Sequence, residues 1–318
     1  MHASRQVLLS EEGPREGFQS EPVGISTQSK VELIEALAET GLAEIACCSF
    51  VNQAQVPQMA DAEQLAAQLR RKAGVRYTGL WLNERGFARA LACGVDLKPT
   101  LVTSASETFG LRNNKRDRQE LLQGQRELAT AYRHAGLNRA AGYVFTAFGC
   151  NYEGEISAAQ VARSVQDVVQ LAADTDMQLE AMYLCDTIGA ASPNQVRKVL
   201  DQVRNAHPTL EFALHLHDTR GLGLANALVG LQMGIRRFDA SIGGLGGCPF
   251  AGNRAAAGNV CTEDLAYLCE QEGFETGLDI DQLLRCALLA ERIVGRTLPG
   301  KLKNAGAFRG ALPPQSAI

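Results

Sequence analysis

Eight short apolar runs alternate with helical patterns along almost the whole 318-residue chain, and this alternation restricts the possible folds more than any other feature. Each run has the length of one strand, and amphipathic helical patterns lie between the runs. We therefore expect parallel strands joined by helices, which favours an α/β fold of the closed (β/α)8 TIM-barrel type. An open doubly wound sheet is the alternative. The expected strands are residues 6–10, 44–50, 77–82, 101–104, 140–148, 179–185, 211–217 and 237–242.

One-sided apolar periodicity marks several helices. They are expected at residues 29–40, 158–173, 194–206, 222–234 and 263–272. Ser29 and Glu32 have the spacing of a capping box at the start of the first of these helices. Residues 1–275 are predicted to form the barrel, and residues 276–318 are predicted to add C-terminal helices packed beside it.

The composition excludes several classes of function. With 46% hydrophobic and 21% charged residues, the chain is typical of an ordinary soluble protein. A net charge of −4 provides no basic stripe, which argues against a nucleic-acid partner, and no apolar run reaches the roughly 18 residues that a membrane helix needs. The nine cysteines are scattered and are typical of free thiols in a reducing compartment. We therefore expect a cytoplasmic enzyme.

Two of the five histidines, His215 and His217, stand at the end of the seventh expected strand. Residues i and i+2 of a strand share a face, so both imidazoles can reach one metal ion. The alternative is a pair of histidines packed on a sheet without a metal. Polar residues also follow most other expected strands, and the active sites of such barrels lie at the C-terminal strand ends. We therefore expect Glu16, which follows the first strand, to lie near the histidines.

Several stretches, in a fixed order, resemble one enzyme family. They include EEGPREGFQSE (11–21), SFVNQAQVPQMAD (49–61), GYVFTAFGCNYEGEI (142–156), CDTIG (185–189), HLHDTRGLGLANALVGLQMGI (215–235) and SIGGLGGCPFAGN (241–253). Through them the chain resembles the 3-hydroxy-3-methylglutaryl-CoA lyases, which belong to a superfamily of barrel metallolyases and Claisen-type synthases. The resemblance implies a divalent-metal-dependent lyase that cleaves an acyl-CoA thioester to acetyl-CoA and a 3-oxo acid. It also implies a homodimer or a larger homo-oligomer.

The resemblance implies a metal site for Mg²⁺ or Mn²⁺, for which mixed imidazole and oxygen ligands are suitable. Its implied ligands are Glu16, His215, His217 and Asn259. Asn259 has an alternative role as the cap of the helix that follows it.

Three catalytic residues are implied in the same way. Arg15 is expected to face the enolate oxygen, where a fixed charge is worth most, although it has an alternative partner in Glu11. Cys248, in a glycine-rich loop, is expected to protonate the product carbanion, with a buried structural thiol as the alternative. Asp186 is expected to orient a metal-bound water or share in proton transfer, and its alternative is a helix cap.

The sequence also departs from the family. Glu16 stands where the family has aspartate, and Ala46 replaces a glutamate of the second strand. The loop after the glycine-rich segment is about two residues longer and carries Arg254. These departures favour a related 3-hydroxyacyl-CoA as the substrate. Side chains expected to contact it are Gln19, Asn113 and Arg254.

Two other functions are compatible with these sequence features. One is a Claisen-condensing acyltransferase of the isopropylmalate or citramalate synthase type. Cys248 argues against it, because those synthases carry an acidic-arginine sequence at that position. The other is a metal-binding barrel without catalysis, against which the retention of both histidines, Arg15 and Cys248 argues.

Overall fold

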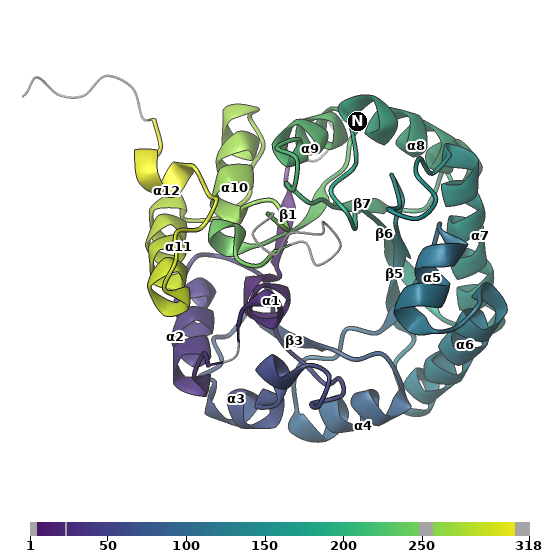
Figure 1. Cartoon of the computed structure of the whole chain (residues 1–318), viewed down its shortest axis with the longest axis horizontal. Helices are drawn as coiled ribbons and strands as arrows, with labels where there is room; N and C mark the ends of the chain where they lie inside the picture. Colours follow the sequence, from purple (N-terminus) through teal and green to yellow (C-terminus); the bar gives the residue numbers. More distant parts are fainter. Residues whose placement is uncertain (1–4, 23, 248–256, 309–318) are drawn as a thin grey trace, which may run out of the picture.

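The computed structural model describes residues 5–22, 24–247 and 257–308, which form a ring of parallel strands surrounded by helices (Figure 1). All eight expected strands are present, so the predicted α/β barrel class is confirmed. The strands are β1 (Leu8–Glu11), β2 (Glu44–Ser49), β3 (Arg76–Leu80), β4 (Thr100–Ser104), β5 (Arg139–Phe145), β6 (Gln178–Cys185), β7 (Phe212–His215) and β8 (Arg237–Ala240).

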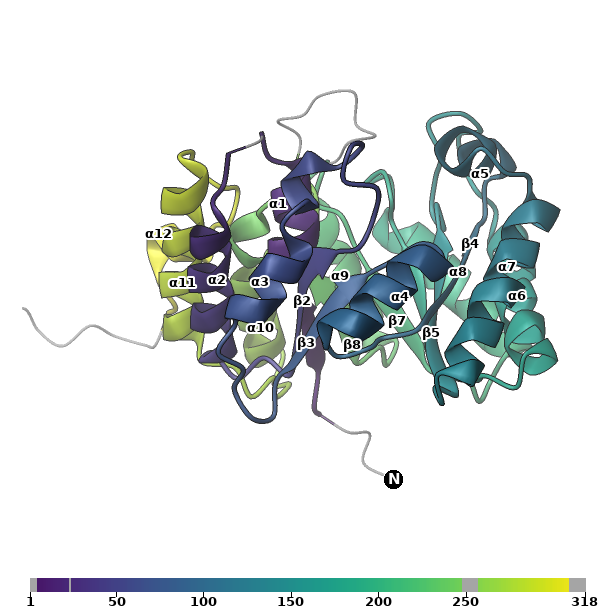
Figure 2. The same ribbon diagram turned by 90° about the horizontal axis from the view of Figure 1, so that it is seen from below.

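Helices cover the outside of the ring, and the five expected from periodicity lie within two residues of their predicted ends. The outer helices are α2 (Thr27–Ala38), α3 (Ala62–Gln68), α4 (Glu84–Cys93), α6 (Arg118–His134), α7 (Ala158–Asp174), α8 (Pro193–Ala206), α9 (Gly223–Gln232) and α10 (Thr262–Gln271), whereas α5 (Glu107–Asn114) lies at one end of the barrel (Figure 2). The expected capping box of Ser29 is wrong. Helix α2 begins at Thr27, and the extended Ser26 caps it by accepting a hydrogen bond from the Ser29 N–H. No described helix is long and apolar enough to cross a membrane.

The ring of strands is open at one seam, between β3 and β4. The hydrogen-bonded order is β3-β2-β1-β8-β7-β6-β5-β4, and no ladder joins the two end strands in the described part of the chain. An isolated bridge between Thr78 and Asp96 closes the seam at one point. Further along, the Val102 N–H of β4 donates to Oε1 of Gln125 on α6, at 2.9 Å. The barrel is therefore not fully closed by strand pairing among the described residues, although full closure is predicted from the sequence. At this point the Gln125 side chain accepts the backbone N–H of Val102, which a neighbouring strand would otherwise accept.

The connection after β1 is compact and leads to the mouth of the barrel. It consists of a π-helical turn, η1 (Gly13–Gly17), and a short helix, α1 (Phe18–Ser20). A Cβ atom at Gly17 would lie 2.6 Å from Cγ of Leu245, so only glycine lets this turn pack so closely on the segment after β8. In the side view of Figure 2, α1 and α5 lie at the same end of the barrel.

Glu11 ties the first strand to the last elements. Its Oε1 accepts hydrogen bonds from the N–H groups of Gly13, at 2.7 Å, and Ile242, at 2.9 Å. Its Oε2 accepts one from the Thr262 hydroxyl at 2.6 Å. Burial raises the pKa of Glu11 to about 7, although these three donors favour the charged form.

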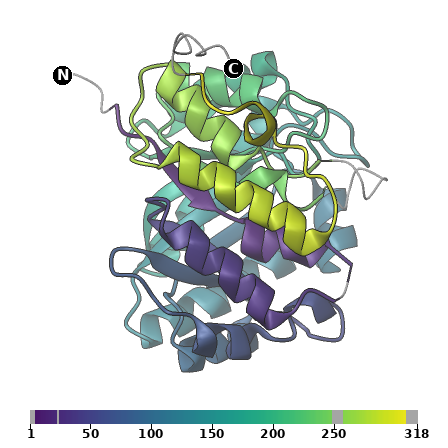
Figure 3. The same cartoon turned by 90° about the vertical axis from the view of Figure 1, so that its left-hand side faces the viewer.

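Two helices follow the barrel, α11 (Ile280–Val294) and α12 (Leu302–Ala305). Helix α11 runs alongside α2 on the outside of the molecule (Figure 3) and also contacts α10. Its buried face carries Leu283, Ala287 and Ala290, at the spacing of an apolar helical stripe. This stripe explains why the segment packs beside the barrel.

Candidate active site

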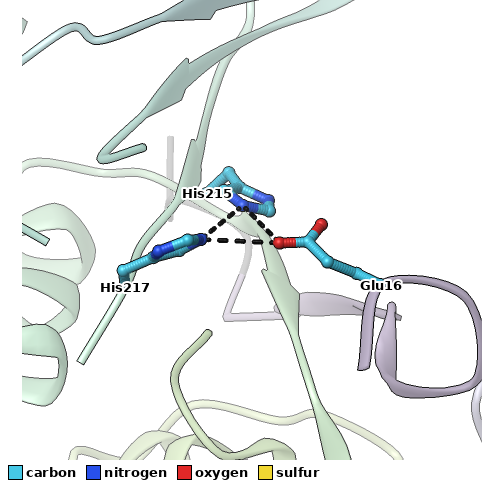
Figure 4. Close-up of side chains that lie close together, drawn as sticks. All are labelled: Glu16, His215 and His217. Atoms are coloured by element: carbon cyan, nitrogen blue, oxygen red, sulfur yellow. Dashed lines mark hydrogen bonds and ion pairs between the residues drawn. The ribbon is translucent and has the colours of Figure 1, made fainter. Parts of the chain in front are cut away.

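Three side chains converge at the C-terminal ends of the strands (Figure 4). Nε2 of His215, the last residue of β7, lies 3.3 Å from Nε2 of His217. Oε1 of Glu16, from η1, lies 3.9 Å from the first nitrogen and 3.5 Å from the second. The segment beyond β7 stays extended because Val260 donates its N–H to the Leu216 carbonyl at 3.0 Å. The i, i+2 spacing therefore brings both imidazoles to one point beside Glu16, as predicted.

The spacing of these atoms fits a single divalent cation. Ligand atoms about 2.1 Å from one octahedral ion lie about 3 Å apart, so the separations of 3.3 to 3.9 Å need only a small contraction. Nδ1 of His215 lies 3.1 Å from Oδ2 of Asp239. This contact fixes the imidazole tautomer and leaves the Nε2 lone pair available to a metal. Asp239 was missed in the sequence, where its only signal is a single acidic residue inside the apolar eighth strand.

Asn259 lies beside His217 through an isolated antiparallel bridge, and only 2% of the residue is exposed. Within the described ranges, its Oδ1 has no hydrogen-bond partner. A buried amide oxygen without a partner is costly unless an ion or ligand satisfies it, so this position fits a fourth metal ligand. The alternative role of Asn259 as a helix cap is wrong, because Cys261 immediately precedes α10.

Arg15 lies between two carboxylates. It pairs with Glu12, and its Nη1 lies 3.1 Å from Oε2 of Glu16. The alternative pairing with Glu11 is wrong, because that buried carboxylate bonds to the groups named above. Burial raises the pKa of Glu16, but Arg15 and the two histidines outweigh burial and hold this pKa well below its ordinary value. The carboxylate is therefore charged, as a metal ligand must be.

Sequence reasoning also missed Glu12, which is 5% exposed. Burial raises the pKa of Glu12, while the Arg15 charge lowers it. Because Glu11 stands opposite Ile45 in the β1–β2 pair, the next residues, Glu12 and Ala46, are neighbours on adjacent strands, and both line one cavity. The carboxylate that directly follows β1 thus stands next to the position where a glutamate of β2 was expected. The signal in the sequence is a pair of consecutive glutamates at a strand end.

Asp186 is buried at the end of β6. Its carboxylate accepts hydrogen bonds from the N–H groups of Ala190, at 2.8 Å, and Ala191, at 3.1 Å. Burial raises its pKa, and the nearby His217 lowers it. Asp186 therefore closes the turn after β6, while Ser192 caps the following helix, so the helix-cap alternative is wrong. Its catalytic role stays a prediction.

The remaining predicted residues are spread over the mouth of the barrel. Oε1 of the half-buried Gln19 accepts a hydrogen bond from the Ser49 hydroxyl at 3.3 Å. Asn113 is exposed in the last turn of α5, outside the lining of the cavity. Cys248 and Arg254 lie outside the described residues, so their predicted roles are untested.

An eight-stranded barrel with two imidazoles and a carboxylate at the strand ends defines a barrel enzyme with a site suited to a divalent metal. Comparison with known proteins identifies its family. The family described as HMGL-like matches residues 6–289. The hydroxymethylglutaryl-CoA lyase of Bacillus subtilis is 38% identical over 297 residues, which cover 93% of this chain and 96% of that protein.

Two further relatives agree. The cytoplasmic 3-hydroxy-3-methylglutaryl-CoA lyase of Mus musculus is 37% identical over 299 residues, covering 94% of this chain and 84% of that protein. The structure of an HMG-CoA lyase from Acinetobacter baumannii, in complex with coenzyme A and 3-methylmalate, matches with a TM-score of 0.87 at 35% identity, covering 98% of this chain and 99% of that one. The chain therefore belongs to the hydroxymethylglutaryl-CoA lyase family. It is an enzyme, and the predicted lyase activity is confirmed over the synthase and non-catalytic alternatives.

Proposed function

We propose that the protein cleaves a 3-hydroxy-3-methylglutaryl-CoA-like 3-hydroxyacyl-CoA to acetyl-CoA and a 3-oxo acid. In this reaction the bond between C2 and C3 breaks, and its electron pair goes to C2 as a thioester enolate. The hydroxyl on C3 loses its proton and becomes the ketone of the 3-oxo acid, while C2 gains a proton. The observation that carries the proposal is the cluster of Glu16, His215 and His217 in a barrel of this family.

The proposed cofactor is Mg²⁺ or Mn²⁺, with Glu16, His215, His217 and Asn259 as its ligands. When bound, such an ion polarises the substrate hydroxyl and lowers its pKa. Asp239 orients the imidazole of His215 for this purpose.

Arg15 is proposed to stabilise the enolate oxygen. Its side chain lines the cavity next to the three ligands. Its Nε is buried and has no hydrogen-bond partner among the described residues, so one donor is available to a substrate oxygen. Glu12 and Glu16 hold the guanidinium from two sides, so its charge is already in place when the enolate forms.

Other roles rest on the family resemblance. Cys248 is proposed to give a proton to C2 of the product, and Asp186 to orient a metal-bound water or to share in proton transfer. Substrate contacts are proposed for Gln19, Asn113 and Arg254. We further propose a cytoplasmic location, supported by the name of the mouse relative, and a homodimer or larger assembly.

The test is cleavage of 3-hydroxy-3-methylglutaryl-CoA by the purified protein, measured as acetoacetate release with Mg²⁺ or Mn²⁺ and again with a chelator. Metal-dependent release is expected. Glu16→Gln should abolish it, because the amide lacks the charge of the carboxylate, whereas Glu39→Gln, at an exposed position after α2, should not. Bound metal without turnover on any thioester would contradict the proposal.

A further inference from the structure

We propose that a chamber in the seam between β3 and β4 binds an apolar substituent on C3 of the substrate that is larger than methyl. The preferred substrate class is then a 3-hydroxyacyl-CoA whose C3 carries an apolar chain of several carbons. The inference rests on the proposed lyase function and adds to it the side chain that the substrate presents.

One cavity of about 220 Å³ contains both the metal centre and this chamber. At its polar end lie Glu16, His215 and His217. Its other end is formed by mostly apolar side chains of four strands and α6, and we call this end the seam chamber. The side chains that define the seam chamber are Ala46, Leu80, Trp81, Val102, Leu128 and Phe145. Because the two ends are continuous, a substrate whose hydroxyl lies at the metal centre can extend another substituent into the seam chamber.

The open seam provides the room. Paired strands lie about 4.8 Å apart and leave no gap that a substrate chain can enter. Here Gln125 replaces the missing strand as the partner of Val102, so Leu128, one turn further along α6, reaches the cavity. The wall behind is held in place, because Nε1 of Trp81 donates to the Tyr132 hydroxyl at 2.6 Å. The seam chamber is therefore an opening with fixed walls.

The seam chamber is apolar because the side chain from β2 is small and because the polar side chains nearby already have partners. Ala46 contributes one methyl group where the resemblance places a glutamate, so no carboxylate enters from β2. The neighbouring Glu12 pairs with Arg15, at the polar end. Lys98, which also lines the cavity, pairs with Glu44, and the Gln125 carbonyl is occupied by Val102. An apolar guest therefore fits these walls better than a charged or strongly hydrogen-bonding one.

A methyl substituent would fill less of the seam chamber than a longer chain, and apolar space that stays empty lowers stability. An alkyl chain that fills it moves from water to apolar walls, which is worth about a fourfold gain in binding for each buried methylene. Two additional methylenes should therefore raise kcat/KM on the order of tenfold.

The experiment compares 3-hydroxy-3-alkylglutaryl-CoA substrates with methyl, propyl and pentyl groups on C3, using the metal-loaded enzyme. We expect kcat/KM to rise from methyl to propyl on the order of tenfold. Leu128→Phe, which fills the seam chamber from α6, and Ala46→Leu, which fills it from β2, should each reduce the preference for the longer chains by about tenfold. The matched control is Leu122→Phe on the same helix, outside the cavity, which should leave the ratio unchanged.

Calorimetric titration with the free 3-hydroxy-3-alkylglutarates measures binding without cleavage, so it tests the seam chamber separately from the proposed lyase function. If no thioester is cleaved, the proposed function is wrong, and tighter binding of the longer diacids would still support the seam chamber. If the methyl thioester is cleaved and the longer chains give equal or lower kcat/KM, the seam chamber proposal is overturned while the lyase function stands.

Discussion

The two ends of the cavity are built from different interactions. At the polar end, hydrogen bonds and ion pairs fix each side chain, as Asp239 fixes His215 and as Glu12 and Glu16 fix Arg15. At the seam chamber, apolar packing shapes the walls, and one side-chain bond replaces a strand ladder. Breaking a carbon–carbon bond requires charges at fixed positions, whereas accepting an alkyl chain requires only shape. The difference indicates that the reaction and the choice of substrate can change independently.

The largest expected effect tests whether the polar end carries the reaction, and it comes from removing a metal ligand. His217→Ala should lower kcat/KM on the order of a thousandfold, because a bound ion supplies several kcal/mol of stabilisation to the transition state. Metal content, measured by mass spectrometry, should fall with it. The exposed His134→Ala serves as the control. Full activity of the His217 variant would place the metal centre elsewhere.

The next largest effect is a pH dependence of the free energy of unfolding, which comes from the buried Glu11 at the end of β1. Burial raises its folded-state pKa from 4.5 to about 7, so in this pH range the folded protein holds a proton that the unfolded chain has lost. The free energy of unfolding should therefore fall by about 3 kcal/mol as the pH rises from about 4.5 to about 7, and then level off. Urea unfolding at several pH values measures this.

Glu11→Gln is the matched variant for that test. The amide oxygen can accept the N–H groups of Gly13 and Ile242, which both bond to Oε1, and the amide nitrogen can donate to Thr262. The variant should keep the fold and lose this part of the pH dependence. An unchanged slope would show that another group titrates.

A smaller change is expected for Asp239→Asn, which keeps the shape of the side chain and loses the charge beside His215. Metal affinity should fall about 10- to 100-fold, as is usual for a residue that orients a metal ligand. Titration with Mn²⁺ measures it. The control variant is Leu128→Phe, at the other end of the cavity, which should leave metal affinity unchanged. A similar loss in both variants would mean that the two ends are coupled.

The smallest expected effect is that of Gln125→Ala, which leaves the N–H of Val102 without its partner. The free energy of unfolding should fall by about 1–2 kcal/mol, while metal affinity is retained. Gln123→Ala, at an exposed position of the same helix, is the control. Equal stability of the two variants would show that water replaces the lost bond.

The sequence predicted the polar end better than the seam chamber. The strands and the meeting of Glu16 with the histidines followed from local periodicity and from the family motifs, which are short-range signals. Asp239 and Glu12 were missed, because their roles depend on which neighbour faces them across strands. The opening between β3 and β4 was missed for a similar reason. Both strands have apolar patterns like those of the other strands, and nothing local in either one indicates that no ladder joins them among the described residues.

The bonds of Glu11 have a consequence for how the enzyme is made. Its partners Ile242 and Thr262 lie 231 and 251 residues further along the chain. At roughly 5–20 residues per second, a ribosome needs about 10 to 50 seconds between delivering Glu11 and delivering Ile242. For that interval the first strand has no neighbour on its β8 side, so the nascent chain exposes an unpaired edge. Assembly of the metal ligands must also wait, because Glu16 emerges long before His215.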